Sequence, residues 1–198
     1  MTPLIAITFS DVIDLLLELE GGVFTNLKSD RGGPTKWGVT VERMRDWRER
    51  HGYSPVSEVI LVAMIDNLDR PLASDIWEGT LWADERKNLE HLPVKVARHI
   101  FQLMAVMGQT QAWREVQRTW NTLFSPPYSG PRPLVVDGIC GVKTREALAG
   151  LNLADGETVH TFNNVLAAHA QGLFRVLVAQ DPTQRENLAG WVNRAGAC

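Results

Sequence analysis

Two carboxylates and a hydroxyl lie close together near the start of the chain. Glu20 directly precedes two glycines, and Asp30 and Thr35 follow in a stretch rich in glycine and proline. A carboxylic acid can protonate a leaving glycosidic oxygen while a second carboxylate holds or deprotonates a water molecule on the opposite face of the sugar, with about 6.5–9.5 Å between the two carboxyl groups. A threonine hydroxyl can help to orient that water. The three residues therefore fit the chemistry of an inverting glycosidase.

The same residues also have a purely structural interpretation. A glutamate ahead of two glycines is most often the end of a helix, and an aspartate in a segment of glycine and proline most often makes a turn. From residue types and spacing alone, both interpretations stay open for Glu20 and Asp30.

A helix from Ser10 to Leu19 is expected to position Glu20. The apolar residues of this segment have the spacing of one buried helix face, and they are Phe9, Val12, Ile13, Leu16 and Leu17. Glu20 follows Ile13 by seven residues and Leu16 by four, so it lies on that face at the carboxyl end of the helix. Apolar surroundings and the negative helix end both disfavour an anion, and we expect the pKa of Glu20 to be raised.

Beyond this helix the sequence indicates one small β structure and otherwise helices. Residues 23–40 are rich in turn-forming residues and end in Val39 and Thr40, which is typical of a hairpin. Helical patterns follow at 41–50, 56–66, 72–82, 93–107, 110–123, 143–150 and 157–179. The predicted fold class is mainly α with a small β-hairpin.

A proline-rich stretch divides the chain. Residues 125–133 hold four of the ten prolines, a composition that favours a loop or a linker. We therefore expect a first region at 8–125 and a second, helical region at 126–198, with the second region either separate from the first or packed on it.

Composition excludes several classes of protein. The chain has 198 residues, with 20 Lys and Arg against 23 Asp and Glu, and a net charge of −3. This balance lacks the basic character of a nucleic-acid-binding protein, and no run of about 18 apolar residues indicates a membrane-spanning helix. Cys140 and Cys198 are expected to be free thiols, although their number also allows one disulfide. No Cys or His spacing indicates a metal site, and the chemistry outlined above needs no cofactor.

The segment at 41–50 alternates charges along a predicted helix. It contains four arginines and three acidic residues, and the arginines are Arg43, Arg45, Arg48 and Arg50. Such a pattern is typical of a solvated helix face. Attraction of an anionic glycan is the second interpretation of the same residues.

The segments 18–26 and 30–40 together resemble a known family signature. The first reads Glu-Leu-Glu-Gly-Gly-Val-Phe-Thr-Asn and the second reads Asp-Arg-Gly-Gly-Pro-Thr-Lys-Trp-Gly-Val-Thr. They look like the Glu-Gly-Gly-aromatic and Asp-x-Gly-Gly-x-Thr pattern of the lysozymes of glycoside hydrolase family 108, which are phage-type muramidases and secretion-activator-like proteins. Weaker similarities follow in order along the chain, at residues 76–82, 92–97, 136–144 and 190–194.

The resemblance implies a lysozyme-like fold and cleavage of the β-1,4 bond between N-acetylmuramic acid and N-acetylglucosamine. It makes Glu20 the catalytic glutamate, and it puts Asp30 and Thr35 at the positions of the aspartate and threonine of the motif. Residues 136–144 resemble the Asp-Gly-x-x-Gly-x-x-Thr of a predicted peptidoglycan-binding module, although from the residues alone this turn is a structural entry to a helix.

Three further residues of the motif are expected to contact substrate. Trp37 lies in the predicted hairpin, where its indole can line the cleft or pack in the core. Gly32 and Gly33 supply bends and leave room for a polymer to approach the backbone closely.

The chain also departs from the family pattern. Val23 stands where an aromatic residue is usual, and the stretch from Gly22 to Asp30 is about one residue longer than the pattern. In the predicted helix at 93–107, Gln102 and Met107 replace an acid and an amide. If those groups contact sugar or support the site, the activity is weakened, altered or lost. Met107 can equally be core packing, since methionine fills irregular gaps.

Three functions are compatible with these features. The first is an N-acetylmuramidase that hydrolyses with inversion, and the second is a lytic transglycosylase, which needs an acid but no aspartate to place water. The third is a non-catalytic protein that binds the cell wall or assists secretion, which would explain Gln102 and Met107.

Each of these functions implies peptidoglycan glycan strands as the partner and neither nucleic acid nor membrane insertion. The apolar start of the chain lacks the basic residues of a signal peptide. We therefore expect synthesis in the cytoplasm and action on peptidoglycan in the periplasm or outside the cell, after release by a holin, as for an endolysin, or by a secretion machine. A secreted toxin would in addition need an immunity partner.

Overall fold

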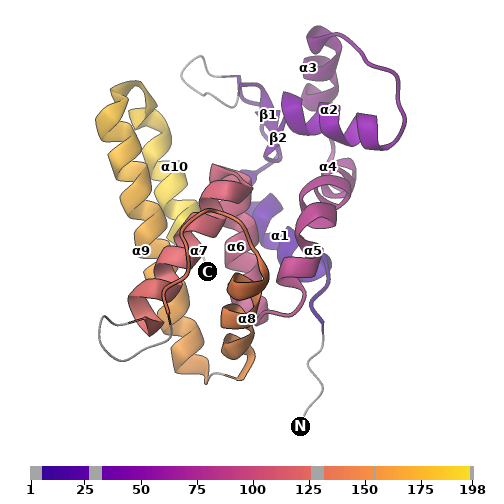
Figure 1. Cartoon of the computed structure of the whole chain (residues 1–198). Coiled ribbons are helices and arrows are strands. Elements are labelled where there is room, and N and C mark those ends of the chain that lie inside the picture. Colours follow the sequence, from indigo (N-terminus) through magenta and orange to yellow (C-terminus); the bar gives the residue numbers. More distant parts are fainter. Residues whose placement is uncertain (1–5, 27–32, 126–131, 154, 197–198) are drawn as a thin grey trace. The chain divides into compact units, whose positions relative to one another are not determined.

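The residues that the structure describes form helices, one short hairpin and the segments that connect them. The structure is a computed structural model that describes residues 6–26, 33–125, 132–153 and 155–196 (Figure 1). By their internal contacts the residues form two compact units, one of residues 13–86 and the other of residues 1–12 together with 87–198. The division into a catalytic region at 8–125 and a binding region at 126–198 stays a prediction.

The unit of residues 13–86 contains the hairpin and the helices next to it. Its elements are α1 (Ser10–Glu20), which begins just before the unit, β1 (Thr35–Lys36), β2 (Val39–Thr40), α2 (Val41–Arg50), α3 (Glu58–Asp66), α4 (Arg70–Trp77), the π-helical turn η1 (Glu78–Trp82) and α5 (Ala83–Leu89), which ends just after it. Its core consists of apolar side chains from several of these elements, among them Leu16, Leu17, Val39, Met44, Leu61, Ile65, Trp77 and Leu81.

The hairpin is held by a very tight turn. Its two strands are antiparallel, with Thr35 opposite Thr40 and Lys36 opposite Val39. The two residues between the strands, Trp37 and Gly38, have φ values of 55° and 72°. Positive φ at both central residues is the geometry of a type I′ turn, which matches the twist of two-residue hairpins. Glycine adopts this conformation freely, whereas tryptophan does so rarely.

The other unit is a group of long helices. Its elements are α6 (Val94–Met107), α7 (Gln109–Phe124), α8 (Val142–Ala149), the 3-10 turn η2 (Gly150–Leu153), α9 (Gly156–Gln180), the 3-10 turn η3 (Pro182–Gln184) and α10 (Arg185–Gly196). Helix α9 contacts α6, α7 and α10, helix α6 also contacts α7 and α10, and α9 and α10 lie side by side (Figure 1). The segment before α1 also packs here, since the ring of Phe9 meets the ring of Phe101 edge to face.

The turn before α8 is tied to α7 by one glutamine. The side-chain amide nitrogen of Gln117 donates to Asp137 Oδ1 at 2.8 Å, to the carbonyl oxygen of Ile139 at 3.1 Å and to Thr144 Oγ1 at 3.3 Å. Its amide oxygen accepts from the backbone N–H of Gly138 at 2.9 Å. Donation from Gln117 and from the Ile139 N–H lowers the pKa of Asp137. The polar residues of this motif therefore serve the fold, as expected of a helix entry.

A buried histidine joins three helices of the same unit. His99 of α6 is fully buried, its Nε2 lies 3.0 Å from the carbonyl oxygen of Ala195 in α10, and its Nδ1 lies 3.3 Å from Asn163 Oδ1 in α9. A carbonyl oxygen can only accept, so Nε2 carries a proton and donates. Burial lowers the pKa of His99 below its ordinary value of 6.5.

This histidine is expected to make the fold acid-sensitive. Below pH 6.5, the ordinary value, the unfolded chain takes up a proton at His99 that the folded chain does not, so the free energy of unfolding falls as the pH drops toward the lowered folded pKa. Urea unfolding at pH 7.5, 6.5 and 5.5 measures this slope. His99→Gln removes the titrating group, and we expect a flatter slope for this variant. Equal slopes for the two proteins would rule out this role of His99.

Over the residues that the structure describes, none of the helices has the length and apolarity needed to cross a membrane.

Candidate active site

Glu20 is the last residue of α1. The helix ends there because Gly21 adopts a left-handed conformation, with φ at 69°, while its N–H still donates to the carbonyl oxygen of Leu17 at 3.0 Å. The preceding turns bury Ile13, Leu16 and Leu17, whereas Glu20 itself is half-buried. The expected placement of Glu20 at the carboxyl end of a helix with a buried apolar face is thus confirmed.

The side chain of Glu20 lies directly on the backbone of the hairpin turn. A Cβ atom added to Gly38 would lie 2.9 Å from Cγ and 3.2 Å from Cδ of Glu20, and 3.0 Å from Cζ2 of Trp77. The carboxyl group therefore has the Gly38 backbone beneath it and the fully buried indole of Trp77 beside it. Any larger residue at position 38 would have to move one of these two side chains.

Two hydrogen bonds fix the turn that carries Gly38. The N–H of Trp37 donates to the carbonyl oxygen of Gly21 at 3.0 Å, and the indole N–H of Trp77 donates to the carbonyl oxygen of Trp37 at 3.0 Å. The left-handed backbone of Trp37 is thereby held between the end of α1 and α4. A left-handed backbone conformation at a residue other than glycine is strained. Strain of this kind persists where the surrounding structure fixes the conformation, and it is concentrated at functional sites.

The indole of Trp37 covers Gly22. A Cβ atom on Gly22 would lie 2.4 Å from Cζ2 and 2.8 Å from Cε2 of this ring. The indole Nε1 of Trp37 is buried and has no hydrogen-bond partner among the described residues. Leaving a buried donor unsatisfied costs about 1–3 kcal/mol. Trp37 thus combines a strained backbone with an unsatisfied donor, next to Glu20.

A cation lies over a ring of Trp77. The guanidinium carbon of Arg43 lies 4.0 Å from the centre of a Trp77 ring, and Nη1 of Arg43 donates to Thr80 Oγ1 at 3.1 Å. The Thr80 hydroxyl donates in turn to the carbonyl oxygen of Ile76. Burial lowers the pKa of Arg43 to about 10, so the group is still charged at neutral pH.

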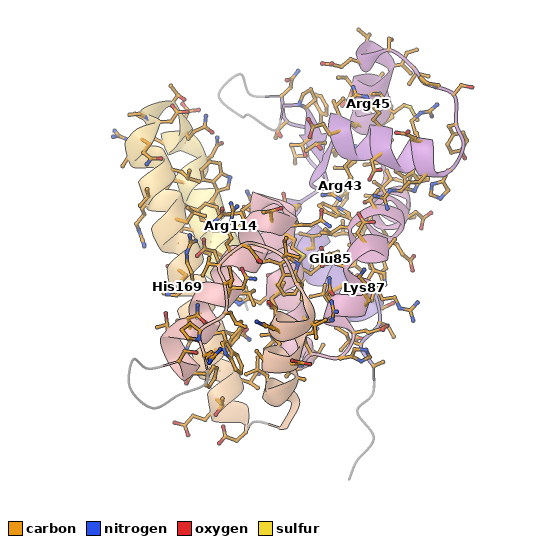
Figure 2. All side chains as sticks on the ribbon, viewed as in Figure 1. Arg43, Arg45, Glu85, Lys87, Arg114 and His169 are labelled. Carbon is orange, nitrogen blue, oxygen red and sulfur yellow. The ribbon has the colours of Figure 1, made fainter. Side chains whose placement is uncertain are left out.

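The arginines of α2 therefore do not all belong to a solvated face. That expectation is wrong for Arg43, which packs on Trp77, because the 100° turn per residue points it inward. Arg45, two residues later, lies on the opposite side of the helix and is exposed (Figure 2). Arg50 pairs with Asp46 at 2.8 Å and with Asp84 at 2.7 Å.

The structure locates four of the six predicted site residues. Glu20 directly precedes the Gly21-Gly22 pair, and Trp37 contacts this pair through its N–H and its indole. Thr35 is in β1, and its N–H and C=O both bond to Thr25 at 2.9 Å. Gly33, with φ at 66°, lines a cavity beside Pro34. Asp30 and Gly32 lie outside the described residues, so their roles stay predictions.

Gln102 and Met107, where the sequence departs from the family pattern, are both in α6. Gln102 is fully buried and Met107 is half-buried. The effect of either residue on activity stays a prediction.

Sequence reasoning missed three residues that shape the surroundings of Glu20. They are Gly38, Trp77 and Arg43, which lie between 18 and 57 positions along the chain from Glu20. The side chain of Trp77 is fully buried. The one local signal was the Trp37-Gly38 pair between two short β segments, since a glycine there indicates a left-handed turn.

The chain is similar to one known protein family and to solved structures. Residues 13–108 match a family described as Glycosyl hydrolase 108. Among solved structures, Brucella abortus SagA is similar to the chain, with 19% sequence identity, coverage of 96% of this chain and 94% of that chain, and a TM-score of 0.61. None of the curated proteins compared with the chain matches it.

The structural likeness confirms the predicted fold, which is lysozyme-like and mainly α with a small hairpin. The family match ends at residue 108, so the resemblance of residues 136–144 to a peptidoglycan-binding module stays a prediction. Residues 13–108, which contain Glu20, Trp37 and Gly38, match this family of glycoside hydrolases, and the match supports glycoside hydrolase activity for the chain.

Proposed function

We propose that the chain is an N-acetylmuramidase that hydrolyses the β-1,4 bond between N-acetylmuramic acid and N-acetylglucosamine of peptidoglycan, with inversion at the anomeric carbon. One observation carries the proposal. The carboxyl group of Glu20 lies on the Gly38 backbone beside the indole of Trp77, inside the segment that matches family 108.

Glu20 acts as the general acid in this proposal. Its proton goes to the glycosidic oxygen as the bond from that oxygen to C1 of N-acetylmuramic acid breaks, and positive charge develops on the sugar ring. A water molecule attacks C1 from the opposite face, Asp30 takes its proton, and Thr35 helps to orient it. The products are a free hydroxyl on N-acetylglucosamine and a muramic-acid hemiacetal.

The surroundings of Glu20 support this role. An apolar neighbour favours the neutral form of a carboxyl group, which is the form that can donate a proton. The indole of Trp77 provides such a neighbour, and at Gly21, the residue after Glu20, a side chain would point into open space, so the backbone there is accessible to a polymer. Trp37 and the pair Gly32 and Gly33 are proposed to contact the sugar rings.

The proposal includes the place of action. The substrate is the glycan strands of peptidoglycan, and the enzyme acts in the periplasm or outside the cell after release by a holin or by a secretion machine. Residues 126–198 are proposed to help the enzyme bind the cell wall. If the protein is a toxin, an immunity partner protects its producer.

Product chemistry tests the reaction type. Purified peptidoglycan treated with the protein is expected to release fragments with reducing muramic-acid ends, and proton NMR early in the reaction is expected to show the α anomer first, since inversion converts the β bond to α. A β anomer first would refute inversion. Fragments lighter by one water molecule, with anhydro ends, would refute hydrolysis in favour of lytic transglycosylation.

A further inference from the structure

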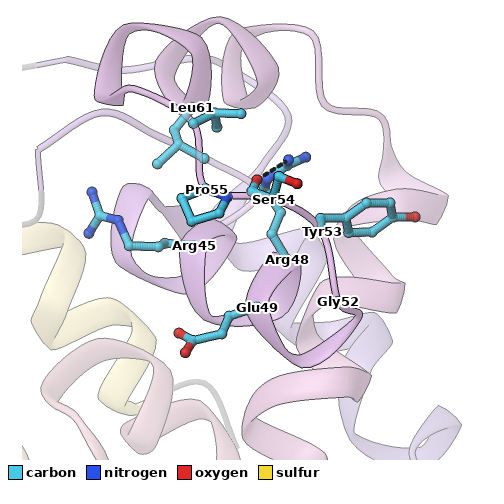
Figure 3. Close-up of a pocket in the computed structure, with 9 residues that line it drawn as sticks. Arg45, Arg48, Glu49, Gly52, Tyr53, Ser54, Pro55 and Leu61 are labelled. Carbon is cyan, nitrogen blue, oxygen red and sulfur yellow. Dashed lines mark hydrogen bonds between the residues drawn. The ribbon is translucent and has the colours of Figure 1, made fainter.

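Two cavities of the unit 13–86 share one residue, Arg45. The smaller cavity, of about 260 Å³, is lined by Gly33 and Pro34, which directly precede Thr35 of β1, and by residues of α2. The larger cavity, of about 430 Å³, lies between α2, the loop that follows it and α3 (Figure 3). Arg45 lines both, so the two cavities meet at its side chain.

Arg45 differs from the other arginines of α2 in having no partner. Arg43 packs on Trp77, Arg48 donates to the carbonyl oxygen of Ser54 at 3.0 Å, and Arg50 pairs with two aspartates. In the part of the chain that the structure describes, Arg45 makes neither an ion pair nor a hydrogen bond. A guanidinium with all its donors available, at the junction of two cavities, can bind a carboxylate in a bidentate manner.

The smaller cavity offers charges of both signs. Besides Arg45 it is lined by Glu42 and Glu58, both exposed carboxylates. A ligand that carries a carboxylate and an ammonium group would match this set. The larger cavity adds apolar walls, since Pro55, Val56 and Leu61 line it, and Figure 3 shows Pro55 and Leu61 close to the stem of Arg45. Its volume is in the range of small-ligand sites, roughly 300–1,000 Å³.

Peptidoglycan contains one component with this chemistry. Its sugars carry no free amines, because they are acetylated, whereas the amino acids of its peptide stems carry free carboxylates, amines and alkyl chains. We propose that the Arg45 cavities bind the peptide stem, with Arg45 on a stem carboxylate and Glu42 and Glu58 facing its ammonium group. The proposal rests on the muramidase function, and it makes Arg45 a determinant of specificity for stem-bearing strands.

Kinetics on two substrates test the role of Arg45. The substrates are intact purified peptidoglycan and the same glycan strands after an amidase has removed their stems. Arg45→Gln is expected to lower kcat/KM on intact peptidoglycan about ten- to hundredfold, as loss of a charged hydrogen bond does. On stripped strands it is expected to equal the wild type. The proposal is overturned if the kcat/KM of Arg45→Gln on intact peptidoglycan equals that of the wild type, or if its kcat/KM falls by the same factor on both substrates.

Arg70→Gln is the matched control. Arg70 is an exposed arginine of α4 that pairs with Asp14 at 2.9 Å and lines neither cavity. Exposed pairs of this kind contribute about 0–1 kcal/mol, so the variant is expected to fold and to behave as the wild type on both substrates.

A binding measurement separates failure of this proposal from failure of the muramidase function. Calorimetry with the free tetrapeptide L-alanyl-γ-D-glutamyl-meso-diaminopimelyl-D-alanine is expected to show saturable binding to the wild type and at least tenfold weaker binding to Arg45→Gln. This result would support the stem site whether or not the wild type releases fragments from the two substrates. Absence of fragments from both substrates would refute the muramidase function but not the stem site. Absence of binding, or equal binding by both proteins, overturns the stem site.

Discussion

Replacing Glu20 by glutamine is expected to abolish lysis of purified peptidoglycan while the fold is retained. Glutamine has the same shape as glutamate but no proton of suitable acidity to give to the leaving oxygen. General acid catalysis contributes about 10²–10⁴-fold to rates, so we expect a fall in kcat of at least about a hundredfold. Turbidity of a peptidoglycan suspension measures the rate, and circular dichroism verifies the fold.

Glu18→Gln is the control for this experiment. Glu18 lies two residues earlier in α1 and is exposed. The Glu18→Gln substitution changes the net charge of the chain by the same amount as Glu20→Gln. In the contacts described, the Glu18 side chain touches neither Gly38 nor Trp77. We expect wild-type lysis from this variant. Lysis by Glu20→Gln at the wild-type rate would refute Glu20 as the acid.

Replacing Gly38 by alanine is expected to damage both stability and activity. The left-handed φ of 72° costs a residue with a side chain roughly 1–2 kcal/mol. The new methyl group would also lie 2.9 Å from Glu20 Cγ and 3.0 Å from Trp77 Cζ2, and overpacking of this kind typically adds about 1–3 kcal/mol. Because Glu20 must move, and a displacement of about 1 Å can cost a hundredfold in rate, we expect a loss of about this size in kcat.

Gly52 provides a matched comparison for the stability term. It has the same φ of 72°, but an added Cβ atom would meet nothing within 4 Å. Urea unfolding of Gly38→Ala and Gly52→Ala therefore separates the cost of backbone strain from the cost of the contact with Glu20 and Trp77. We expect the greater destabilisation in Gly38→Ala. Equal destabilisation would mean that the Glu20 side chain does not lie tightly on the turn.

The helices that were predicted best are those with clear local signals. The helix expected at 41–50 is α2 with the same bounds, and its first turn is capped by the Thr40 side chain, which accepts from the Arg43 N–H. The helix expected at 93–107 begins one residue later, after Pro93. Capping residues, proline and glycine act over a few positions, so such boundaries can be predicted from sequence.

Elements that depend on distant partners were predicted poorly. The segment 72–82 was expected to be one helix, but it is α4 followed by a π-helical turn. Within that turn, a Cβ atom on Gly79 would lie 3.1 Å from Trp47 and 3.2 Å from His51, which shows how closely α2 packs there. Apolar spacing does not reveal a single π turn, because the pattern on either side of it is still helical.

The last helix was also missed. Residues 185–196 form α10, which is not among the helical patterns predicted from the sequence. Most helical stability in proteins comes from packing. Here the ring of Trp191 packs against that of Phe174 in α9, and the Ala195 carbonyl accepts from His99. Neither contact can be inferred from local sequence.

The candidate site likewise combines a feature that local sequence predicts with contacts that arise only from tertiary packing. Glu20 could be predicted because a helix period and two glycines place it without any tertiary information. Its contact with Gly38 and Trp77, and the support of Trp77 by Arg43, follow from packing of α1, the hairpin, α2 and α4. The arginine pattern of α2 predicted one solvated face, whereas burial distinguishes Arg43 from Arg45.

The central claim is that Glu20 is the acid of a hydrolytic muramidase. The most direct measurement is mass spectrometry of the fragments that wild type and Glu20→Gln release from the same purified peptidoglycan. The claim predicts fragments with reducing muramic-acid ends from the wild type and none above background from the variant. Reducing ends in equal amounts from both proteins, or no fragments from the wild type, would contradict it.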